Sequence, residues 1–369
     1  MSASTFAPTL LPPTLQAVRR KRACVRVGQG SRVGVVLLNL GGPTCLEQTD
    51  AFVERVFADL HDVRATNSFI WGRWTSGRQR AEVAAYLKAA YEAIGGRSPL
   101  NRDMRAMARA LQRALRRTEW VDLGVSFRVY EALRYGTPSI EDTIRQMQLD
   151  EIDEVVLLPL CPRMDNRSDS VGLRHWLALS HQQLAGPWQP VLADDYANHP
   201  AYTEAVNDRI DEALGRFPRH VRDEVMLVFA AHAHTKASVA HVEALHQRIM
   251  HERGDNRATT LSIQKKRRPT SWVTDGTAKA LKKCAKAGET AVLLVPLTFV
   301  TDHIETLHGL DVQVRSQAHA WGIEHVEVTA GLNNHATFIR ALEASVLTHI
   351  EMAEAERDRL KQGQYAHAG

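Results

Sequence analysis

The chain contains few cysteines, and none of them lies close to another. They are Cys24, Cys45, Cys161 and Cys284, and no C-x-x-C pair occurs among the 369 residues. This spacing argues against a disulfide framework, and against a zinc or iron–sulfur centre held by neighbouring thiolates. Free thiols in a reducing compartment are the simpler interpretation.

Long apolar runs are also absent, and so are acidic residues near the start. The sequence has no stretch of about 18 apolar residues, which predicts no transmembrane helix. Residues 1–32 contain no Asp or Glu, but their basic residues are Arg19, Arg20, Lys21, Arg22, Arg26 and Arg32. This composition resembles that of an organelle transit peptide. Because prolines at positions 8, 12 and 13 interrupt any long helix, we expect residues 1–32 to be a disordered basic arm.

The remaining composition is ordinary for a globular protein. Hydrophobic residues make up 44% of the chain and charged residues 24%, and the length suits two domains or one two-lobed unit. The net charge of +4 fits an anionic small substrate or a membrane surface as well as nucleic acid, so it excludes no class of partner.

Apolar runs and amphipathic stretches alternate along both halves of the chain. A continuous apolar run such as Val33–Leu40 is typical of a strand buried on both faces of a parallel sheet. In the first half we expect strands at 33–40, 125–130 and 154–160, and helices near 46–59, 80–94, 102–117 and 138–149. In the second half we expect strands at 225–231, 259–263, 291–296 and 324–328, and helices near 237–252, 273–287, 312–321 and 335–361.

This order predicts an α/β protein with two Rossmann-like lobes, each a parallel sheet flanked by helices. The polar, turn-like segment at 165–170 predicts the boundary between them. We therefore expect residues 33–168 and 335–362 to form the first lobe, and residues 169–334 to form the second.

Polar side chains follow two predicted strands of the second half. One strand runs directly into His232 and His234, and another is followed by Asp302, His303 and Glu305. Ligands of open α/β sheets bind beyond the carboxyl ends of the strands. Histidine accepts protons near neutral pH and binds divalent metals, and glutamate relays protons. A structural role for each histidine is the simpler alternative.

Two further segments suggest ligand contacts. Arg134 and Tyr135 follow a predicted strand, where a fixed arginine suits a carboxylate and a surface ion pair is the alternative. Residues 68–80, which include Trp71, interleave aromatic and basic residues. This pattern suits a membrane interface, a large flat ligand or nucleobases, and plain packing against the core is the alternative.

Five segments, in a common order, resemble motifs of the ferrochelatase family. The most specific is Phe299–Leu307, which is nearly F-x-S-D-H-I-E-T-L. Residues 91–100 match Y-x-x-I-G-G-x-S-P-L closely. The other segments are the opening strand and turn at 35–43, the M-R-Y-x-x-P-like segment at 133–138, and the L-N-D-H-P-x-F-like segment at 332–338. On these motifs the chain is identified as a member of that family over roughly residues 33–350.

The resemblance implies a chelatase-like fold with a porphyrin cleft between the lobes, and insertion of Fe²⁺ into a porphyrin in haem biosynthesis. It places His232 at the family's active-site histidine and Glu305 at its acidic partner, so both are the expected catalytic residues. The expected metal contacts are His232, His234 and Glu305. The expected substrate contacts are Leu40, Trp71, Arg134, Tyr135, Gln264, Trp272 and His303. Residues 68–80 correspond to a lip that contacts the membrane in some members.

The chain departs from the family pattern around the histidine. At residues 230–235 the family's S-A-H-[GS]-L-P reads A-A-H-A-H-T, so its glycine or serine, its leucine and its proline are lost. Only Gln264, Pro269 and Trp272 survive of a second motif. Leu40 stands where members acting on coproporphyrin tend to have tyrosine, which favours protoporphyrin IX. No cysteine cluster follows the last helix, so we expect no iron–sulfur cluster and no tightly bound cofactor.

Three interpretations follow. The first is an active cytoplasmic ferrochelatase that binds a porphyrin and a divalent metal, with peripheral membrane contact through residues 68–80 and no nucleic-acid partner. The second is a divergent chelatase for another metal or tetrapyrrole. The third is a non-catalytic tetrapyrrole-binding paralogue.

Overall fold

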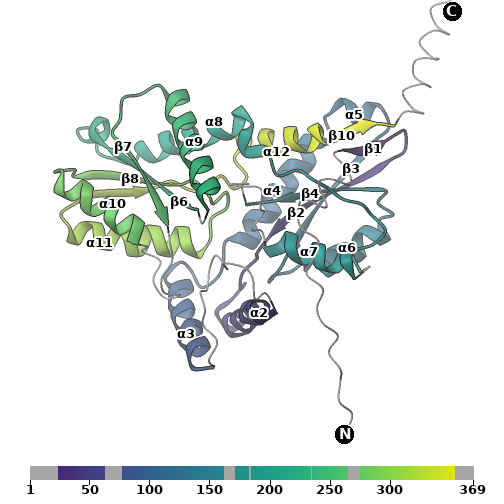
Figure 1. Cartoon of the computed structure of the whole chain (residues 1–369), viewed down its shortest axis with the longest axis horizontal. Helices are drawn as coiled ribbons and strands as arrows, with labels where there is room; N and C mark the ends of the chain where they lie inside the picture. Colours follow the sequence, from purple (N-terminus) through teal and green to yellow (C-terminus); the bar gives the residue numbers. More distant parts are fainter. Residues whose placement is uncertain are drawn as a thin grey trace, which may run out of the picture.

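The computed structural model contains two parallel β-sheets that lie side by side, with helices packed around each (Figure 1). The structure describes residues 24–62, 77–161, 171–182, 184–233, 235–264 and 275–353. This arrangement confirms the α/β fold class with two Rossmann-like lobes.

The first sheet contains β2 (Arg32–Asn39), β3 (Ser126–Leu133), β4 (Glu154–Pro159) and β5 (Val191–Leu192). Its strand order is β3-β2-β4-β5, and every pair is parallel. The six residues from Val33 to Leu38 are all buried, as a continuous apolar run predicts for a central strand covered on both faces.

The second sheet contains β6 (Met226–His232), β7 (Thr259–Gln264), β8 (Ala291–Pro296) and β9 (His325–Val328). Its order, β7-β6-β8-β9, repeats that of the first sheet, and all of its pairs are parallel. In each sheet the first strand has its two successors on opposite sides. The strand order therefore reverses between β2 and β4 and between β6 and β8, and such switch points are where open α/β sheets bind ligands.

Helices cover these sheets and connect their strands. In the first half they are α2 (Thr49–Asp62), α3 (Gly77–Ala93), α4 (Leu100–Leu115), α5 (Glu119–Asp122), α6 (Ile140–Leu149) and α7 (Val171–His181). In the second half they are α8 (Pro200–Leu214), α9 (Lys236–Arg253), α10 (Asp275–Lys286), α11 (Arg315–Ala320) and α12 (Ala336–Thr348). Short 3-10 turns lie at Leu46–Gln48, Tyr196–Asn198 and Arg222–Glu224, and a π-helix spans Glu305–Val314.

The two ends of the described chain pair with each other, which corrects two expectations. Strand β1 (Val25–Val27) pairs in parallel with β10 (Ile350–Met352), so the expected disordered arm at 1–32 is wrong for its last residues. Residues 1–23 lie outside the described chain. The last helix ends at Thr348 instead of near 361, because the chain after it joins β1. Val25 and Val27 are fully buried, and this burial favours the strand over a solvated arm.

The expected lobe boundary at 168 is too early. Strand β5 at Val191–Leu192 pairs with β4 and therefore belongs to the first sheet. Trp176 and Leu173 of α7 pack in the same hydrophobic cluster as β2 and β4. The chain crosses to the second lobe at α8, which the sequence analysis did not anticipate.

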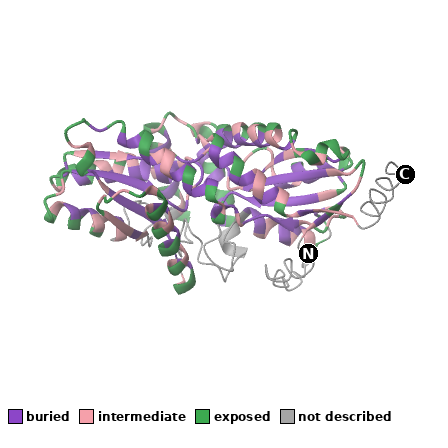
Figure 2. Cartoon of the chain, turned by 90° about the horizontal axis from the view of Figure 1, so that it is seen from above, coloured by how far each residue is buried: buried purple, intermediate pink, exposed green. Residues whose placement is uncertain are grey.

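A hydrophobic core runs through both lobes. In Figure 2 the buried residues occupy the strands and the inward helix faces of both sheets, and exposed residues lie at the periphery. One cluster joins Leu37 of the first sheet to Phe229 of the second through Tyr202 and Phe338. Because α8 and α12 supply these two aromatic residues, they connect the lobes through a shared core.

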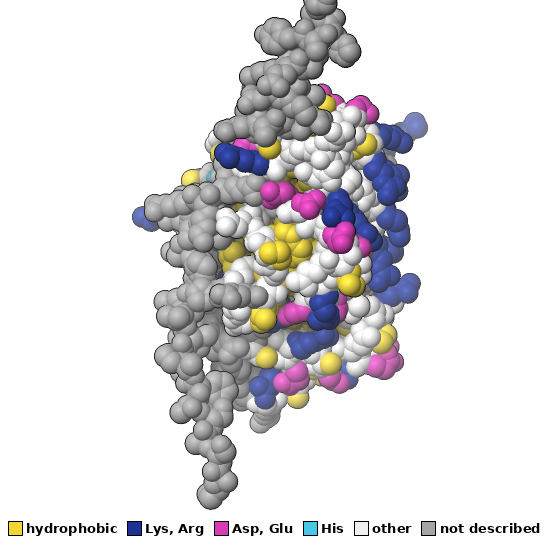
Figure 3. All heavy atoms as spheres, turned by 90° about the vertical axis from the view of Figure 1, so that its right-hand side faces the viewer, with side chains coloured by type: hydrophobic (Ala, Val, Ile, Leu, Met, Phe, Trp, Pro, Cys, Tyr) yellow, Lys and Arg dark blue, Asp and Glu magenta, His cyan; other side chains and the backbone are white. Residues whose placement is uncertain are grey.

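The outer surface is strongly charged. One end of the molecule shows a row of Lys and Arg side chains along its margin (Figure 3). The face of α4 opposite Met104 and Leu111 carries exposed arginines at intervals of three or four residues: Arg102, Arg105, Arg109 and Arg113, followed by Arg116 at the C-cap. Such a split between apolar and charged faces is typical of a helix that packs on a sheet with one side in water.

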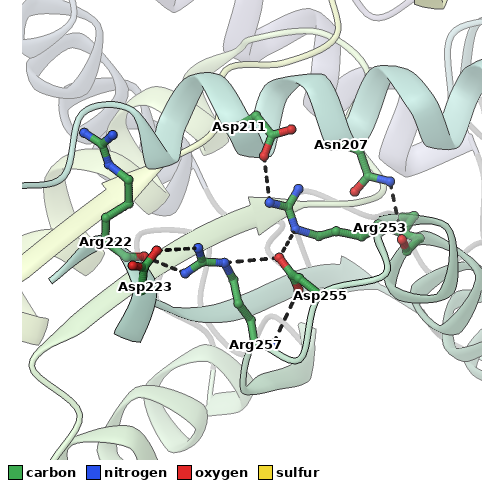
Figure 4. Close-up of polar contacts among 8 residues, drawn as sticks. Asn207, Asp211, Arg222, Asp223, Arg253, Asp255 and Arg257 are labelled. Atoms are coloured by element: carbon green, nitrogen blue, oxygen red, sulfur yellow. Dashed lines mark hydrogen bonds and ion pairs between the residues drawn. The ribbon is translucent and has the colours of Figure 1, made fainter. Parts of the chain in front are cut away.

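An ion-pair network links segments of the second lobe at the end of the sheet where its strands begin (Figure 4). Arg253 contacts Asp211 and Asp255 at 2.6 Å each, and Arg257 contacts Asp255 at 3.2 Å and Asp223 at 3.7 Å. The Arg253 and Arg257 side chains are largely buried. This network lies at the opposite edge of the sheet from the candidate site.

No helix in the described part of the chain is long and apolar enough to span a membrane.

Candidate active site

The site forms where two neighbouring strands of the second sheet end. Strand β6 ends at His232, and the loop that follows β8 leads to Glu305, the first residue of the π-helix. Since β6 and β8 flank the switch point of this sheet, their carboxyl ends bring a histidine and a carboxylate to the position expected for ligand binding.

His232 and Glu305 lie close together in a buried setting. The distance from His232 Nε2 to Glu305 Oε2 is 3.5 Å, and the two side chains are 3% and 6% exposed. His303 Nε2 lies 3.8 Å from the same carboxylate oxygen. The Phe299 ring packs against both imidazoles, with centroid distances of 5.0 Å to His232 and 4.5 Å to His303. One carboxylate is thus shared by two histidines that are held in place by a single aromatic ring.

The loop before Glu305 is held by a reciprocal hydrogen-bond clamp. The Asp302 backbone N–H donates to Asn333 Oδ1 at 2.9 Å, and Asn333 Nδ2 donates to Asp302 Oδ2 at 2.8 Å. The Gly331 N–H and the Thr306 hydroxyl donate to Asp302 Oδ1 at 3.0 and 3.3 Å. A Cβ on Gly331 would lie 2.8 Å from the Asp302 nitrogen, so the close approach requires glycine.

The π-helix that begins at Glu305 is anchored in the second lobe. Leu310 and Val314 are buried against the second sheet, whereas Ile304, just before the helix, packs with residues of α2 and α3. π-Helical segments are rare and are often found at functional sites. The sequence predicted a helix at 312–321, and the structure places its start seven residues earlier with a wider turn, which 3.6-residue periodicity cannot predict.

The first lobe contributes a second set of strand-end residues. Asn39, at the end of β2, donates from Nδ2 to Thr301 Oγ1 at 3.4 Å, which joins the loops of the two lobes. The Arg134 N–H donates to the Asn39 carbonyl, and the Arg134 side chain lies 3.4 Å from His175 Nε2. His175 in turn contacts Glu141 at 2.6 Å. Arg134 therefore lies at the carboxyl end of β3 beside His175, and its predicted contact with a substrate carboxylate remains a prediction.

Tyr135 and Leu40 are placed differently from Arg134. Tyr135 is almost fully buried and packs edge-to-face on Phe52 at 5.9 Å. Leu40 packs on the same cluster, which also contains Ile304. Both residues thus take part in the packing beneath the site, and their predicted contact with substrate remains a prediction.

Of four further residues predicted for the site, the structure describes only one. Trp71, His234 and Trp272 lie outside the described residues. Gln264 is the last residue of β7, and its backbone pairs with His232. Among the described residues, no group of three His, Cys, Asp or Glu side chains has a geometry that would hold a metal ion. The metal contacts predicted for His232, His234 and Glu305 therefore remain predictions.

Several residues that shape the site were not assigned a role from the sequence. Phe299 and Asn333 fall within motifs noted there, and their position beside Asp302, His303 or Glu305 was the available signal. Asn39 also falls within a noted motif, the opening strand and turn at 35–43, whereas Thr298 gave no signal beyond following a strand.

The fold and the site together indicate which kind of chemistry the protein can perform. A buried histidine–carboxylate pair at the switch point of a two-lobed α/β protein is suited to moving protons in a water-poor environment.

Comparison with known proteins gives the family. A model of the ferrochelatase family matches residues 32–350. The ferrochelatase of Synechocystis sp. is 32% identical over 329 residues, covering 86% of this chain and 82% of that relative. The ferrochelatase of Thermosynechococcus vestitus is 33% identical over 325 residues, covering 85% and 81%. The chain belongs to the ferrochelatase family and is a metal chelatase.

Among solved structures, the sirohydrochlorin chelatase SirB from Bacillus subtilis in complex with cobalt covers 86% of this chain and 95% of its own, with 9% identity and a TM-score of 0.41.

Proposed function

We propose that this protein inserts Fe²⁺ into protoporphyrin IX, with His232 as the proton acceptor and Glu305 as the relay. The observation that carries the proposal is the buried pair of His232 and Glu305, 3.5 Å apart at the switch point of the second sheet. Iron and the porphyrin are both substrates, and the proposal includes no tightly bound cofactor and no iron–sulfur cluster.

Both groups suit the chemistry of the reaction. A free porphyrin carries two pyrrole N–H protons, and both must leave before a metal occupies the ring. A neutral imidazole accepts a proton near neutral pH, and an adjacent carboxylate stabilises the imidazolium and accepts the proton in turn. Because His232 and Glu305 are both buried, water competes weakly for these protons.

The surroundings keep this pair in a fixed geometry. Phe299 packs on His232 and His303, and the clamp of Asp302 and Asn333 fixes the loop that leads to Glu305. A planar porphyrin must bend to expose its nitrogen lone pairs, and binding energy supplies this distortion most effectively in a rigid site. Arg134 is the proposed partner for a porphyrin carboxylate, because a guanidinium binds carboxylates by two parallel hydrogen bonds.

The preference for protoporphyrin IX rests on Leu40. This side chain is apolar and packs on the cluster of Phe52 and Tyr135, so it offers no hydrogen bond to the additional carboxylates of coproporphyrin III. Peripheral membrane contact through residues 68–80, in a cytoplasmic protein, is part of the proposal and rests only on the composition of that segment.

Metal insertion into protoporphyrin IX tests the proposal directly. The Soret band of the porphyrin is followed with Fe²⁺ or Zn²⁺ for the wild type, His232→Ala, Glu305→Gln and a control, His246→Ala. His246 is a half-buried histidine that packs on Phe229 within the same lobe. Since a positioned acid or base contributes about 10²–10⁴-fold, we expect losses of at least about 100-fold for His232→Ala and Glu305→Gln, and little change for the control.

The same assay separates the alternatives. A spectral shift on porphyrin binding without metal uptake by the wild type would refute chelation and favour a tetrapyrrole-binding protein. Faster insertion of Co²⁺ or Ni²⁺, or faster reaction with coproporphyrin III, would identify a divergent chelatase. Full chelation by His232→Ala would exclude His232 as the proton acceptor.

A further inference from the structure

Strands β6 and β8 separate just before the candidate site, and side chains complete their hydrogen bonding there. The last backbone bond between them runs from the Leu297 N–H to the Ala230 carbonyl at 2.9 Å. In a regular parallel ladder the next bond would join the His232 N–H to the Leu297 carbonyl. Instead, the His232 N–H donates to Thr298 Oγ1 at 3.1 Å, and the Leu297 carbonyl accepts from the Tyr202 hydroxyl at 3.1 Å.

Burial makes both substitutes necessary. His232, Leu297, Thr298 and Tyr202 are each at most 6% exposed. A backbone N–H or carbonyl that is buried without a partner destabilises the folded state. Where the strands separate, Thr298 therefore satisfies the donor of the missing bond and Tyr202 satisfies its acceptor.

The separation of the strands shapes the site. After Thr298 the chain carries Phe299 against the His232 ring, and the two ring centroids are 5.0 Å apart. The same loop then turns and starts the π-helix, which brings Glu305 to 3.5 Å from His232. A ladder continued by one more backbone bond would hold Thr298 and Phe299 along β6 and keep this loop away from the imidazole.

We infer that Thr298 and Tyr202 are positioning residues for His232, and that they set the distance between its imidazole and Glu305. This inference rests on the proposed function, because it assigns a role to residues that act through the proposed proton acceptor. Neither side chain needs to touch the porphyrin or the metal. Each fixes a backbone group at the end of β6 or β8, and thereby fixes the start of the segment that carries a reacting side chain.

The test pairs a variant that removes only the hydroxyl of Thr298 with a variant that keeps it. Thr298→Val removes the acceptor of the His232 N–H and keeps the shape, whereas Thr298→Ser keeps the acceptor. A displacement of about 1 Å at a reacting group costs up to about 100-fold in rate. We therefore expect Thr298→Val to lower kcat for protoporphyrin IX about tenfold or more, with little change in KM, and Thr298→Ser to restore most of the rate.

A second variant tests the other half of the arrangement. Tyr202→Phe removes only the hydroxyl that binds the Leu297 carbonyl, and it should lower kcat in the same direction as Thr298→Val. The matched control is Tyr196→Phe. Tyr196 belongs to the same aromatic cluster, with its ring centroid 6.1 Å from that of Tyr202, but its hydroxyl donates to the Pro159 carbonyl in the first lobe. The control should leave kcat unchanged.

A readout independent of chelation completes the test. The ring nitrogens of His232 are titrated by NMR in the absence of porphyrin, with the His232 signal identified by its loss in His232→Asn. If Thr298 and Tyr202 position the imidazole beside Glu305, the titration midpoint shifts in Thr298→Val and Tyr202→Phe, and it stays at the wild-type value in Thr298→Ser and Tyr196→Phe. A general loss of stability would lower the melting temperature without moving this midpoint.

The outcomes separate this inference from the proposed function. If His232→Ala retains the wild-type rate, the proposed role of His232 fails regardless of Thr298. If His232→Ala is inactive but both Thr298→Val and Tyr202→Phe match the wild type in kcat and in the His232 midpoint, only the positioning inference fails. Should Thr298→Val not fold, Tyr202→Phe and Tyr196→Phe decide the question alone.

Discussion

The clamp between Asp302 and Asn333 offers the sharpest test of how the site is built. Asn333 exchanges two hydrogen bonds with Asp302, one to the backbone N–H at 2.9 Å and one to the carboxylate at 2.8 Å. Asn333 also has a positive φ of 46°, a conformation that few residues other than glycine and asparagine adopt easily. Two variants separate these contributions, because Asn333→Gly removes only the side chain and Asn333→Ala also strains the backbone.

The magnitude follows from the bonds that are lost. A neutral hydrogen bond contributes about 1 kcal/mol and one to a charged group about 1.5–3 kcal/mol. Asn333 is half-buried, so the lower part of the summed range applies, and we expect Asn333→Gly to lower the free energy of unfolding by about 2.5–3 kcal/mol. Asn333→Ala should cost about 1 kcal/mol more, since alanine is disfavoured at positive φ.

Urea denaturation measures these changes, and Asn334→Gly serves as the control because Asn334 is the exposed neighbour. Chelation should also slow in Asn333→Gly, since Asp302 begins the loop that places Glu305. Equal urea midpoints for Asn333→Gly and Asn334→Gly would refute the clamp. Equal stability of Asn333→Gly and Asn333→Ala would refute the argument from backbone strain.

Two other predictions concern stability. Burial lowers the pKa of His246 and His308 below the ordinary value of 6.5, so the unfolded chain takes up protons at a pH where the folded chain does not. The free energy of unfolding should therefore fall as the pH drops from about 7.5 to about 5.5, and the double variant His246→Gln/His308→Gln should flatten this slope in urea titrations. Equal slopes would contradict the prediction. Val25→Ala and Val27→Ala should each lower the free energy of unfolding by about 1–3 kcal/mol, because both valines of β1 are fully buried. Urea denaturation measures this change, with Arg26→Ala at the exposed position between them as the control. Stability like that of Arg26→Ala would show that β1 does not contribute.

The central strands of both sheets could be predicted because they are continuous apolar runs. Strand β8 matches its predicted bounds, Ala291–Pro296, and the other strands at the switch points lie within one or two residues of theirs. Two short strands, β5 and β10, could not be predicted from the same signal. The strand β5, at Val191–Leu192, is too short to show a pattern, and β10, at Ile350–Met352, continues the apolar spacing of the helix before it.

Helix α8 was missed for a different reason. Three of its hydrophobic residues are alanine, and the larger ones are Tyr202, Val206, Ile210 and Leu214, so the amphipathic signal is weak. Proline at its first position and His199 as its N-cap, which accepts a hydrogen bond from the Ala201 N–H, mark its start in the structure. Because this helix was missed, the lobe boundary was predicted too early.

The candidate site was predictable where chemistry and strand ends coincide. His232, His303 and Glu305 each follow a strand of the second sheet, and the structure brings all three together. Thr298 and Tyr202 were not predictable, because their importance depends on which backbone groups remain unpaired when β6 and β8 separate. The burial of Tyr135 could not be predicted from its neighbours in the sequence either.

The pairing of β1 with β10 has a consequence for how the chain acquires its structure. Arg26 of β1 and Glu351 of β10 form an ion pair, although they lie 325 positions apart in the sequence. On the ribosome β1 is synthesised before both lobes and β10 after them, so this small sheet closes last. Until then, Val25 and Val27 lack the part of their cover that β10 supplies. A nascent chain arrested before Ile350 would leave these valines less buried, and their full burial would distinguish a finished first lobe from an unfinished one.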